Sequence, residues 1–408
     1  MVSNSTVKNT LLFLATLFIY SVNSYSFSSD KKEIHPIVSS TIRVGAENTT
    51  AYFDLLRNKK VGILTNQTGV VRTDTHTNSY TSTVDFLLQN NINVTKIYAP
   101  EHGFRGTADA GELIKDGKDT QTGLPIISLY GNSKKPSKEQ LANIDILLFD
   151  LQDVGARFYT YISSLHYVME ACAENNIPLV ILDRPNPNIS LIDGPILEVK
   201  NKSFVGMHPI PILHGMTIGE YALMINGEKW LNQGIQAPIT VIPNLNYTRQ
   251  SSYSLPVAPS PNLPNDQAIN LYASLCFFEG TNVSSGRGTN LQFQIYGSPF
   301  LKDMPYQFTP KPNPGAKDPM NNGKLCYGEN LSKETPVTQL ELKWLLKAYR
   351  QSQNKDKFFT NFFVKLAGTE QLKQQIIAGK TEAEIRQSWQ TELVSFKTTR
   401  APYLLYSN

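Results

Sequence analysis

A predicted strand ends in a cluster of charged side chains in the segment Val94-Thr95-Lys96-Ile97-Tyr98-Ala99-Pro100-Glu101-His102-Gly103-Phe104-Arg105-Gly106. The β-branched and aromatic residues of Val94–Tyr98 predict a buried strand, and Pro100 ends it because proline cannot donate to a sheet ladder. A carboxyl, an imidazole and a guanidinium group follow within five residues, among glycines that let the backbone turn sharply. On its own, this pattern fits a polar turn as well as a binding site.

The same pattern recurs after three further apolar runs, Lys60–Thr65, Ile144–Phe149 and Pro178–Leu182. Polar residues follow each run directly: Asn66 and Gln67, then Asp150 and Asp153, then Asp183, Arg184 and Asn186. Leu124–Tyr130 is another strand-like run. Because ligands bind outside the carboxyl ends of the strands in open parallel sheets, we expect these polar residues to meet at one site.

Helices are predicted between these strands. Tyr159–Asn175 has apolar residues at helical spacing, and Thr217 with Glu220 forms a capping box, so Glu220 is expected to be a cap rather than a catalyst. Alternating strands and helices predict an α/β fold with a doubly wound parallel sheet and right-handed crossovers.

The character of the sequence changes at about Leu255, where proline becomes frequent. A loop-rich region to about residue 335 is followed by predicted helices. One of these opens at Thr381 and is expected to bury Ile385, Trp389, Leu393 and Phe396. We therefore predict a first domain over residues 40–254 and a second, smaller α+β domain over residues 255–408.

The N-terminal residues 1–25 have the composition of a secretory signal peptide. Lys8 precedes an apolar run, Leu11–Val22, and Val22-Asn23-Ser24 supplies small residues at a cleavage spacing. The alternative is an uncleaved N-terminal anchor. We expect a periplasmic or secreted protein that begins near Tyr25 and has no stable membrane insertion after cleavage.

Composition excludes several other classes of protein. The 408 residues carry a net charge of only +4 and contain no basic run interleaved with aromatic residues, so nucleic acid is not an expected partner. The three cysteines, Cys172, Cys276 and Cys326, are an odd number without close spacing, and at least one is expected to be free unless it pairs with another chain.

The motifs of several enzyme classes are also absent from the sequence. It lacks the Gly-rich dinucleotide turn, the Walker loop, the nucleophile elbow and the zinc-protease helix motif. The histidines His102, His166, His208 and His214 have no metal-ligand spacing, so neither a metal nor a cofactor is expected. A site rich in carboxylates, amides, arginine and tyrosine suits a polyhydroxylated substrate, and paired carboxyl groups are the usual apparatus of glycoside hydrolysis.

Longer motifs point to one family. In chain order they are PEHGFRG, DAGE (Asp109–Glu112), FDLQDVGARFYTYI (Phe149–Ile162), LDRPNP, HGMTIGE, PSPNLP, EGTNVSSGRGT and RAPYLLY (Arg400–Tyr406). Over residues 40–408 the sequence resembles the secreted exo-β-N-acetylmuramidases, a glycoside hydrolase family long described as a domain of unknown function.

The resemblance implies release of terminal N-acetylmuramic acid (MurNAc) from the non-reducing ends of peptidoglycan fragments during cell-wall recycling. The expected partner is a muropeptide or a disaccharide such as MurNAc-GlcNAc, where GlcNAc is N-acetylglucosamine. The resemblance also implies a cleft between a Rossmann-like domain and the smaller C-terminal domain. It assigns Glu101 first as catalytic, and we expect desolvation in a partly closed cleft to raise its pKa so that it holds a proton. Candidates for the second carboxylate are Glu112, Asp153 and Glu279, of which Asp153 is favoured for its place at a strand end.

MurNAc carries a lactyl carboxylate, which an arginine binds with two parallel hydrogen bonds. The candidate arginines are Arg105, Arg157, Arg184 and Arg287, with the alternative that Arg184 only holds Asp183. The remaining candidates for substrate binding are Asn66, Gln67, His102, Asp183, Asn186, His214 and Asn262. Two competing classes stay open at this point: a non-catalytic sugar-binding protein, and a hydrolase of another bond, for which no nucleophile–histidine pair is evident.

Overall fold

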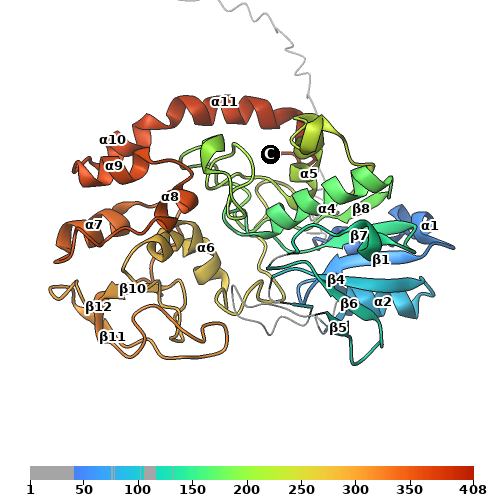
Figure 1. The fold of residues 1–408 in the computed structure, drawn as a ribbon, viewed down its shortest axis with the longest axis horizontal. Coiled ribbons are helices and arrows are strands. Elements are labelled where there is room, and N and C mark those ends of the chain that lie inside the picture. The colour runs from blue at the N-terminus through green and yellow to red at the C-terminus, as the bar shows by residue number, and fades with distance from the viewer. Residues whose placement is uncertain (1–40, 75–76, 78, 102, 105–115, 132) are drawn as a thin grey trace, which may run out of the picture. The chain divides into compact units, whose positions relative to one another are not determined.

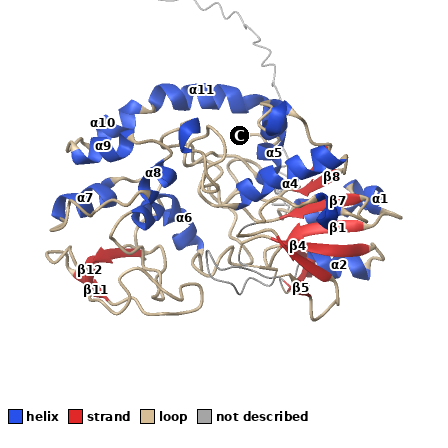
Figure 2. Ribbon diagram, in the orientation of Figure 1, coloured by secondary structure: helices blue, strands red, loops and turns tan. Residues whose placement is uncertain are grey.

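Continuous apolar runs form the centre of a seven-stranded sheet in this computed structural model (Figures 1 and 2). The structure describes residues 41–74, 77, 79–101, 103–104, 116–131 and 133–408. The sheet order is β5-β6-β4-β1-β7-β8-β9. The bounds are β1 Val61–Thr65, β4 Val94–Ala99, β5 Gly117–Lys118, β6 Pro125–Ser128, β7 Ile146–Asp150, β8 Leu179–Leu182 and β9 Ile239–Ile242.

All neighbouring strands of this sheet pair in parallel except β5, which is antiparallel to β6 at the edge. Counted along the chain, the six parallel strands have the order 3-2-1-4-5-6 of a Rossmann-like fold. The predicted doubly wound parallel sheet is confirmed. In this order the direction of winding reverses between β1 and β7, which is where such folds bind their ligands.

Helices cover both faces of the sheet. Along β7, Leu147 and Phe149 belong to the apolar cluster of α4 (Tyr161–Asn175) and α5 (Ile218–Gly227). Ile146 and Leu148 point the other way and belong to the cluster of α1 (Phe53–Leu56) and α2 (Thr83–Gln89). A strand buried on both faces needs an uninterrupted apolar run, which is why β7 was recognisable in the sequence.

The capping box predicted at the start of α5 is confirmed. The Thr217 hydroxyl accepts from the Glu220 amide at 3.2 Å, and the Glu220 carboxylate accepts from the Thr217 amide at 3.0 Å. Other elements had no clear sequence signal: the edge strands β5 and β9, the short helix α3 (Lys138–Leu141), and an antiparallel hairpin of β2 (Val70–Asp74) and β3 (Ser79–Ser82).

Residues 255–408, here called the C-terminal lobe, combine a small sheet with helices. The antiparallel sheet has the order β10-β12-β11 (Ile295–Ser298, Cys326–Asn330 and Tyr306–Phe308). The helices are α6 Asp266–Leu275, α7 Lys343–Gln351, α8 Phe362–Ala367, α9 Gln371–Ile377, α10 Glu382–Ser388 and α11 Gln390–Arg400.

The single helix predicted from Thr381 is wrong in one respect. It is divided into α10 and α11 at Trp389, which has a non-helical backbone and whose indole N–H donates to Asp193 at 3.1 Å. The four apolar residues expected on its buried face are buried, because both helices keep the same side toward the core.

Residues Thr41–Asn408 form one compact unit, in which the C-terminal lobe packs on the remainder, here called the N-terminal lobe. The boundary predicted between residues 254 and 255 therefore stays a prediction. Within the described parts of the chain, no helix is long and apolar enough to span a membrane. Cys172, Cys276 and Cys326 are all buried and free.

Candidate active site

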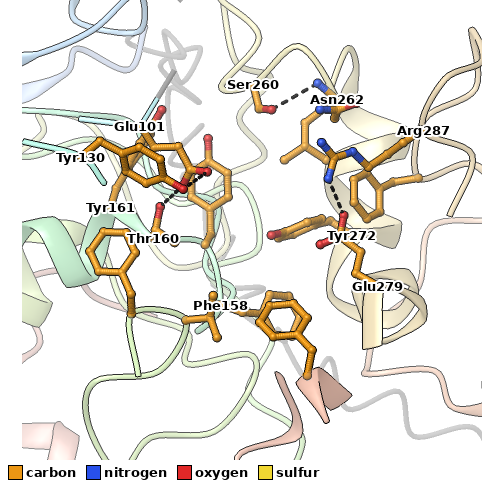
Figure 3. A pocket seen from close by; sticks show the side chains of 16 residues that line it. Glu101, Tyr130, Phe158, Thr160, Tyr161, Ser260, Asn262, Tyr272, Glu279 and Arg287 are labelled. Atoms are coloured by element: carbon orange, nitrogen blue, oxygen red, sulfur yellow. Dashed lines mark hydrogen bonds and ion pairs between the residues drawn. The ribbon is translucent and has the colours of Figure 1, made fainter. Parts of the chain in front are cut away.

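A cavity of about 210 Å³ lies between the carboxyl edge of the sheet and the C-terminal lobe. Glu101, Tyr130 and Thr160 line it from the N-terminal lobe, and Asn262, Glu279 and Arg287 line it from the C-terminal lobe. Figure 3 shows these two groups on opposite sides of the cavity, with Phe158 between them at its lower edge. The charged side chains among its described lining are Glu101, Glu279 and Arg287.

Glu101 follows β4 directly after Pro100, as the sequence predicted, and it is half-buried. The Tyr130 hydroxyl donates to its Oε1 at 3.0 Å, and the Thr160 hydroxyl donates to its Oε2 at 2.6 Å. A hydroxyl group can donate or accept, so both partners can stay in place when the carboxyl group gains a proton. This arrangement suits a group that transfers a proton.

Glu279 and Arg287 form an ion pair across the EGTNVSSGRGT motif. Arg287 Nη1 donates to Glu279 Oε1 at 2.9 Å, and Nη2 donates to the Gly315 carbonyl at 3.2 Å. Burial acts to lower the pKa of Arg287, but the adjacent Glu279 carboxylate raises it, so the guanidinium stays charged. Gly286 and Gly288, on either side of Arg287, both have positive φ (83° and 80°), which explains the G-R-G sequence.

Aromatic side chains form much of the cavity wall. Phe158, Tyr159, Tyr272 and Phe293 are all buried, and Tyr272 meets each of the other three rings edge to face at centroid distances between 4.9 and 5.9 Å. The Tyr159 hydroxyl is satisfied by the Pro259 carbonyl at 2.7 Å. Such walls present apolar surface to a ligand while the carboxylates and the guanidinium supply specific polar contacts.

Two predicted amides also contribute to the site. Asn262 lines the cavity, with its Nδ2 bound to the Gly315 carbonyl at 2.7 Å and its buried Oδ1 lacking a partner among the described residues. Gln67 follows β1 and donates to the Ala258 and Pro259 carbonyls, each at 3.3 Å. Gln67 therefore joins the sheet edge to the C-terminal lobe and does not line the cavity.

Two predicted arginines have structural positions instead. Arg157 is fully buried and donates to four backbone carbonyls, those of Pro195, Ile210, Leu366 and Ala367, at 2.7–3.0 Å. Arg184 pairs with Asp150 at 2.6 and 3.0 Å, not with Asp183 as the alternative held. Neither guanidinium lines the cavity, so neither residue is placed to bind a ligand there, contrary to the prediction.

Three polar residues from the strand ends also stabilise the fold. Asn66 accepts from Thr68 and donates to the Tyr161 hydroxyl, and Asn186 donates to the Met216 carbonyl at 2.9 Å. Asp183 accepts from Tyr406, Thr217 and Gly219. Burial raises the pKa of Asp183 to about 7, although the donated hydrogen bonds oppose that shift. None of the three lines the cavity.

Asp153, favoured as the second carboxylate, is buried and absent from the cavity wall. Its Oδ2 accepts from the Gly155 amide at 2.7 Å and lies 3.5 Å from His214 Nε2, so these two predicted residues meet each other rather than the cavity. Of the candidates for the second carboxylate, only Glu279 lines the described cavity. Glu112, His102 and Arg105 lie outside the described residues.

Tyr130 and Thr160, which hold Glu101, were not predicted as site residues. Thr160 lies in the recognised motif FDLQDVGARFYTYI, directly before α4, so the motif was a usable signal. Tyr130 ends a strand-like run and carried no such signal. The contact between His166 and His208, whose ring nitrogens lie 3.0 Å apart, was not predicted either. No group of three or more metal-ligating side chains occurs within the described ranges.

A carboxyl group at the edge of the Rossmann-like sheet faces a second carboxylate across an aromatic cavity, and such paired carboxyl groups are the apparatus that glycosidases use. Residues 61–267 match the family described as Exo-beta-N-acetylmuramidase NamZ, N-terminal, and residues 270–406 match its C-terminal counterpart. The chain belongs to this family of glycosidases, as the sequence resemblance indicated.

Individual relatives agree with this assignment. The chain is 37% identical to the peptidoglycan beta-N-acetylmuramidase NamZ of Bacillus subtilis (strain 168), over 98% of this chain and 100% of that protein. A DUF1343 family protein from Bacteroides fragilis NCTC 9343 matches with a TM-score of 0.82 and 47% identity, covering 90% of this chain and 100% of its own. A second DUF1343 protein from the same organism matches with a TM-score of 0.74 and 27% identity, covering 90% of this chain and 99% of its own.

Proposed function

We propose that this protein is an exo-β-N-acetylmuramidase that releases terminal MurNAc from the non-reducing end of peptidoglycan fragments such as MurNAc-GlcNAc. The observation that carries the proposal is the position of Glu101 at the edge of the sheet, held by two hydroxyl groups in a cavity that also contains Glu279 and Arg287. Full-length similarity to the B. subtilis enzyme supports the same substrate.

Glu101 acts in this proposal as the general acid that protonates the glycosidic oxygen. Glu279 is the candidate for the second carboxylate, because it lies in the same cavity and its ion pair with Arg287 orients it. Glu279 takes this role instead of the predicted Asp153, because Glu279 lines the cavity and Asp153 does not. The aromatic walls exclude water and present apolar surface to the sugar ring.

Arg287 is the proposed partner of the lactyl carboxylate. Of the four arginines considered, Arg157 and Arg184 are occupied elsewhere, Arg105 lies outside the described residues, and Arg287 lines the cavity. Its two hydrogen bonds to Glu279 and Gly315 use two of the five N–H donors of the guanidinium, so donors remain for a second anion beside Glu279.

The test uses two disaccharides that differ only in the order of their sugars. MurNAc-β-1,4-GlcNAc should release MurNAc, whereas GlcNAc-β-1,4-MurNAc should stay intact because its terminal sugar lacks the lactyl group. A chromogenic MurNAc glycoside should likewise be cleaved far faster than the matching GlcNAc glycoside. Equal cleavage of the two disaccharides, or cleavage of neither, contradicts the proposal.

We also propose that the protein acts outside the cytoplasm, in the periplasm or the medium, after removal of residues 1–25. The basis is the sequence pattern of Lys8, the apolar run Leu11–Val22 and the small residues that follow. N-terminal sequencing of protein recovered outside the cytoplasm should give a start near Tyr25. A start at Met1 would contradict cleavage.

A further inference from the structure

A second cavity, of about 460 Å³, adjoins the first. The two cavities share Glu279, Arg287 and Phe362 as lining residues. Among the described residues, the remaining lining of the second cavity comes from the C-terminal lobe, from residues 283–285, 316 and 318–320. A ligand held in the first cavity can therefore continue past the Glu279–Arg287 pair into a separate space.

Phe362 differs from the other aromatic residues of these cavities. Phe362 is 41% exposed, whereas Phe158, Tyr159, Tyr272 and Phe293 are buried and Tyr130 and Phe204 are half-buried. Its neighbour Phe363 is completely buried and packs on Phe359 at a centroid distance of 4.6 Å. Phe363 thus anchors the start of α8, so the exposed ring of Phe362 is carried on a fixed backbone.

The same packing places Phe362 beside Glu279. Thr360 donates to the Gly280 carbonyl at 2.9 Å, and Asn282 donates to the Phe358 carbonyl at 2.9 Å. A Cβ at Gly280 would lie 2.4 Å from the Phe363 Cα, so only glycine permits this close approach. The loop that carries the carboxylate and the helix that carries the exposed ring are therefore positioned together.

We propose that Phe362 is a specificity-determining residue whose ring stacks on the second sugar, the GlcNAc that leaves when MurNAc is released. This inference rests on the proposed function. The C–H faces of a pyranose present apolar surface that an exposed aromatic ring can cover, while the sugar's polar edges stay solvated. The second cavity then accommodates the leaving sugar.

The placement of the two sugars follows from exposure. An exo-acting enzyme encloses the terminal sugar and must let the rest of its substrate extend to solvent. The smaller cavity, with its buried rings and Glu101, suits the terminal MurNAc. The larger cavity, with the exposed Phe362, suits the sugar that continues outward.

The experiment compares two substrates that share MurNAc and a poor leaving group: MurNAc-β-1,4-GlcNAc, and the methyl β-glycoside of MurNAc. Binding energy from a remote part of a substrate raises turnover, so the wild-type protein should prefer the disaccharide. In Phe362→Ala, kcat/KM for the disaccharide should fall roughly tenfold, with a smaller change for the methyl glycoside. Phe362→Trp should restore most of the preference.

Phe300→Ala is the matched control, since Phe300 is also exposed (36%) but lines neither cavity, and its preference should equal that of the wild-type protein. An unchanged preference in Phe362→Ala, or an equal loss on both substrates, would overturn the inference while leaving the proposed function intact. A wild-type protein that cleaves neither substrate would overturn the proposed function and this inference with it.

Discussion

Glu101 is held by hydroxyl groups, whereas Arg287 is held by a carboxylate and a backbone carbonyl. The two kinds of support have different consequences. The Tyr130 and Thr160 hydroxyls can reverse their hydrogen bonds with Glu101, because a hydroxyl group both donates and accepts. The partners of Arg287 only accept, so its charge and orientation are fixed before substrate arrives.

Glu101→Gln should leave substrate binding intact and lower turnover of MurNAc-GlcNAc by about 10²–10⁴-fold, the usual contribution of general acid catalysis. Glutamine keeps the shape and the contacts with Tyr130 and Thr160 but cannot supply a titrating proton. The measurement is kcat on the disaccharide, with the exposed Glu139→Gln as control. Near-normal turnover would remove Glu101 from the catalytic role; an activated nitrophenyl glycoside is a weaker test because its leaving group needs little protonation.

Arg287→Lys should abolish recognition of the lactyl carboxylate, because lysine cannot make two parallel hydrogen bonds. The comparison is between the MurNAc glycoside and the same glycoside with its lactyl group converted to a methyl ester. The wild-type protein should prefer the free acid, and the variant should show little preference, with kcat/KM for the free acid reduced by about 10²-fold. A preference for the free acid that persists in Arg287→Lys would assign the carboxylate to another residue.

At the level of elements, a buried chain of polar side chains links His166 of α4 through His208 to Tyr221 of α5. His166 Nδ1 lies 3.0 Å from His208 Nε2, and His208 Nδ1 lies 2.7 Å from the Tyr221 hydroxyl. His166 also faces Glu170, which pairs with Lys135 at 2.8 Å. Burial lowers the pKa of His166 to about 4, with the charge of Lys202 acting in the same direction and that of Glu170 opposing it.

This histidine pair predicts acid sensitivity. Burial lowers the pKa of His208 well below its usual value too, so both rings stay neutral in the folded state while unfolded chains begin to bind protons near pH 6.5. The contribution of this histidine pair to the free energy of unfolding is therefore fully present above pH 6.5. It falls as the pH drops toward 4, by about 3 kcal/mol for His166 alone. The melting temperature should fall more steeply over this range in the wild-type protein than in a His166→Gln/His208→Gln variant. Parallel curves for the two proteins would contradict this account.

The sequence predicted the elements whose signal is local. β1, β7 and β8 are buried on both faces and leave nearly continuous apolar runs, and the capping box marks the start of α5 within four residues. By contrast, β9 has mixed burial, and the break at Trp389 depends on Asp193, which is remote in sequence. Local patterns cannot report such tertiary partners.

The same limit explains the predictions about the site. The position of Glu101 at a strand end correctly predicted that it lies at the cavity. The same rule could not distinguish Glu101 from Asp150 or Asp183, which lie at the ends of equivalent strands. What distinguishes these acids is their partners: Asp150 forms an ion pair with Arg184, and Asp183 accepts hydrogen bonds from the Tyr406 and Thr217 hydroxyls. Glu279 and Arg287 line the cavity because of the way the C-terminal lobe packs. That packing cannot be predicted from the residue pattern of a single strand.

At the scale of the whole molecule, the C-terminal residues complete the N-terminal lobe. The Tyr406 hydroxyl donates to Asp183 at the end of β8 and accepts from the Asn244 amide at 2.8 Å. In the other direction, Arg157 from the N-terminal lobe is satisfied by the carbonyls of Leu366 and Ala367 at the end of α8. Each lobe therefore supplies hydrogen-bond partners to buried groups of the other.

Tyr406→Phe should lower the free energy of unfolding by about 1–3 kcal/mol, because a buried carboxyl group loses a donor. The folded-state pKa of Asp183, about 7, lies above its unfolded value, so its contribution to stability is lost as pH rises from 3.8 to 7. Removing the hydroxyl raises that pKa further, so the variant should be destabilised more at pH 8 than at pH 5. Tyr403→Phe, whose hydroxyl donates to the half-buried Glu228 rather than to a fully buried carboxyl group, is the control and should cost less. An equal cost in both variants at both pH values would contradict the role of Tyr406.

These reciprocal contacts also determine when the protein can fold during its synthesis. The hydrogen bond from Tyr406 to Asp183 spans 223 positions of sequence, and those from Arg157 to α8 span about as many. A nascent chain that has produced only the sheet therefore contains Arg157 and Asp183 with some of their partners, but it still lacks the Leu366 and Ala367 carbonyls and the Tyr406 hydroxyl. Contacts so distant in sequence form slowly, because a long loop must close first. The full set of native hydrogen bonds around Asp183 at the end of β8 is therefore complete only once Tyr406 has been made.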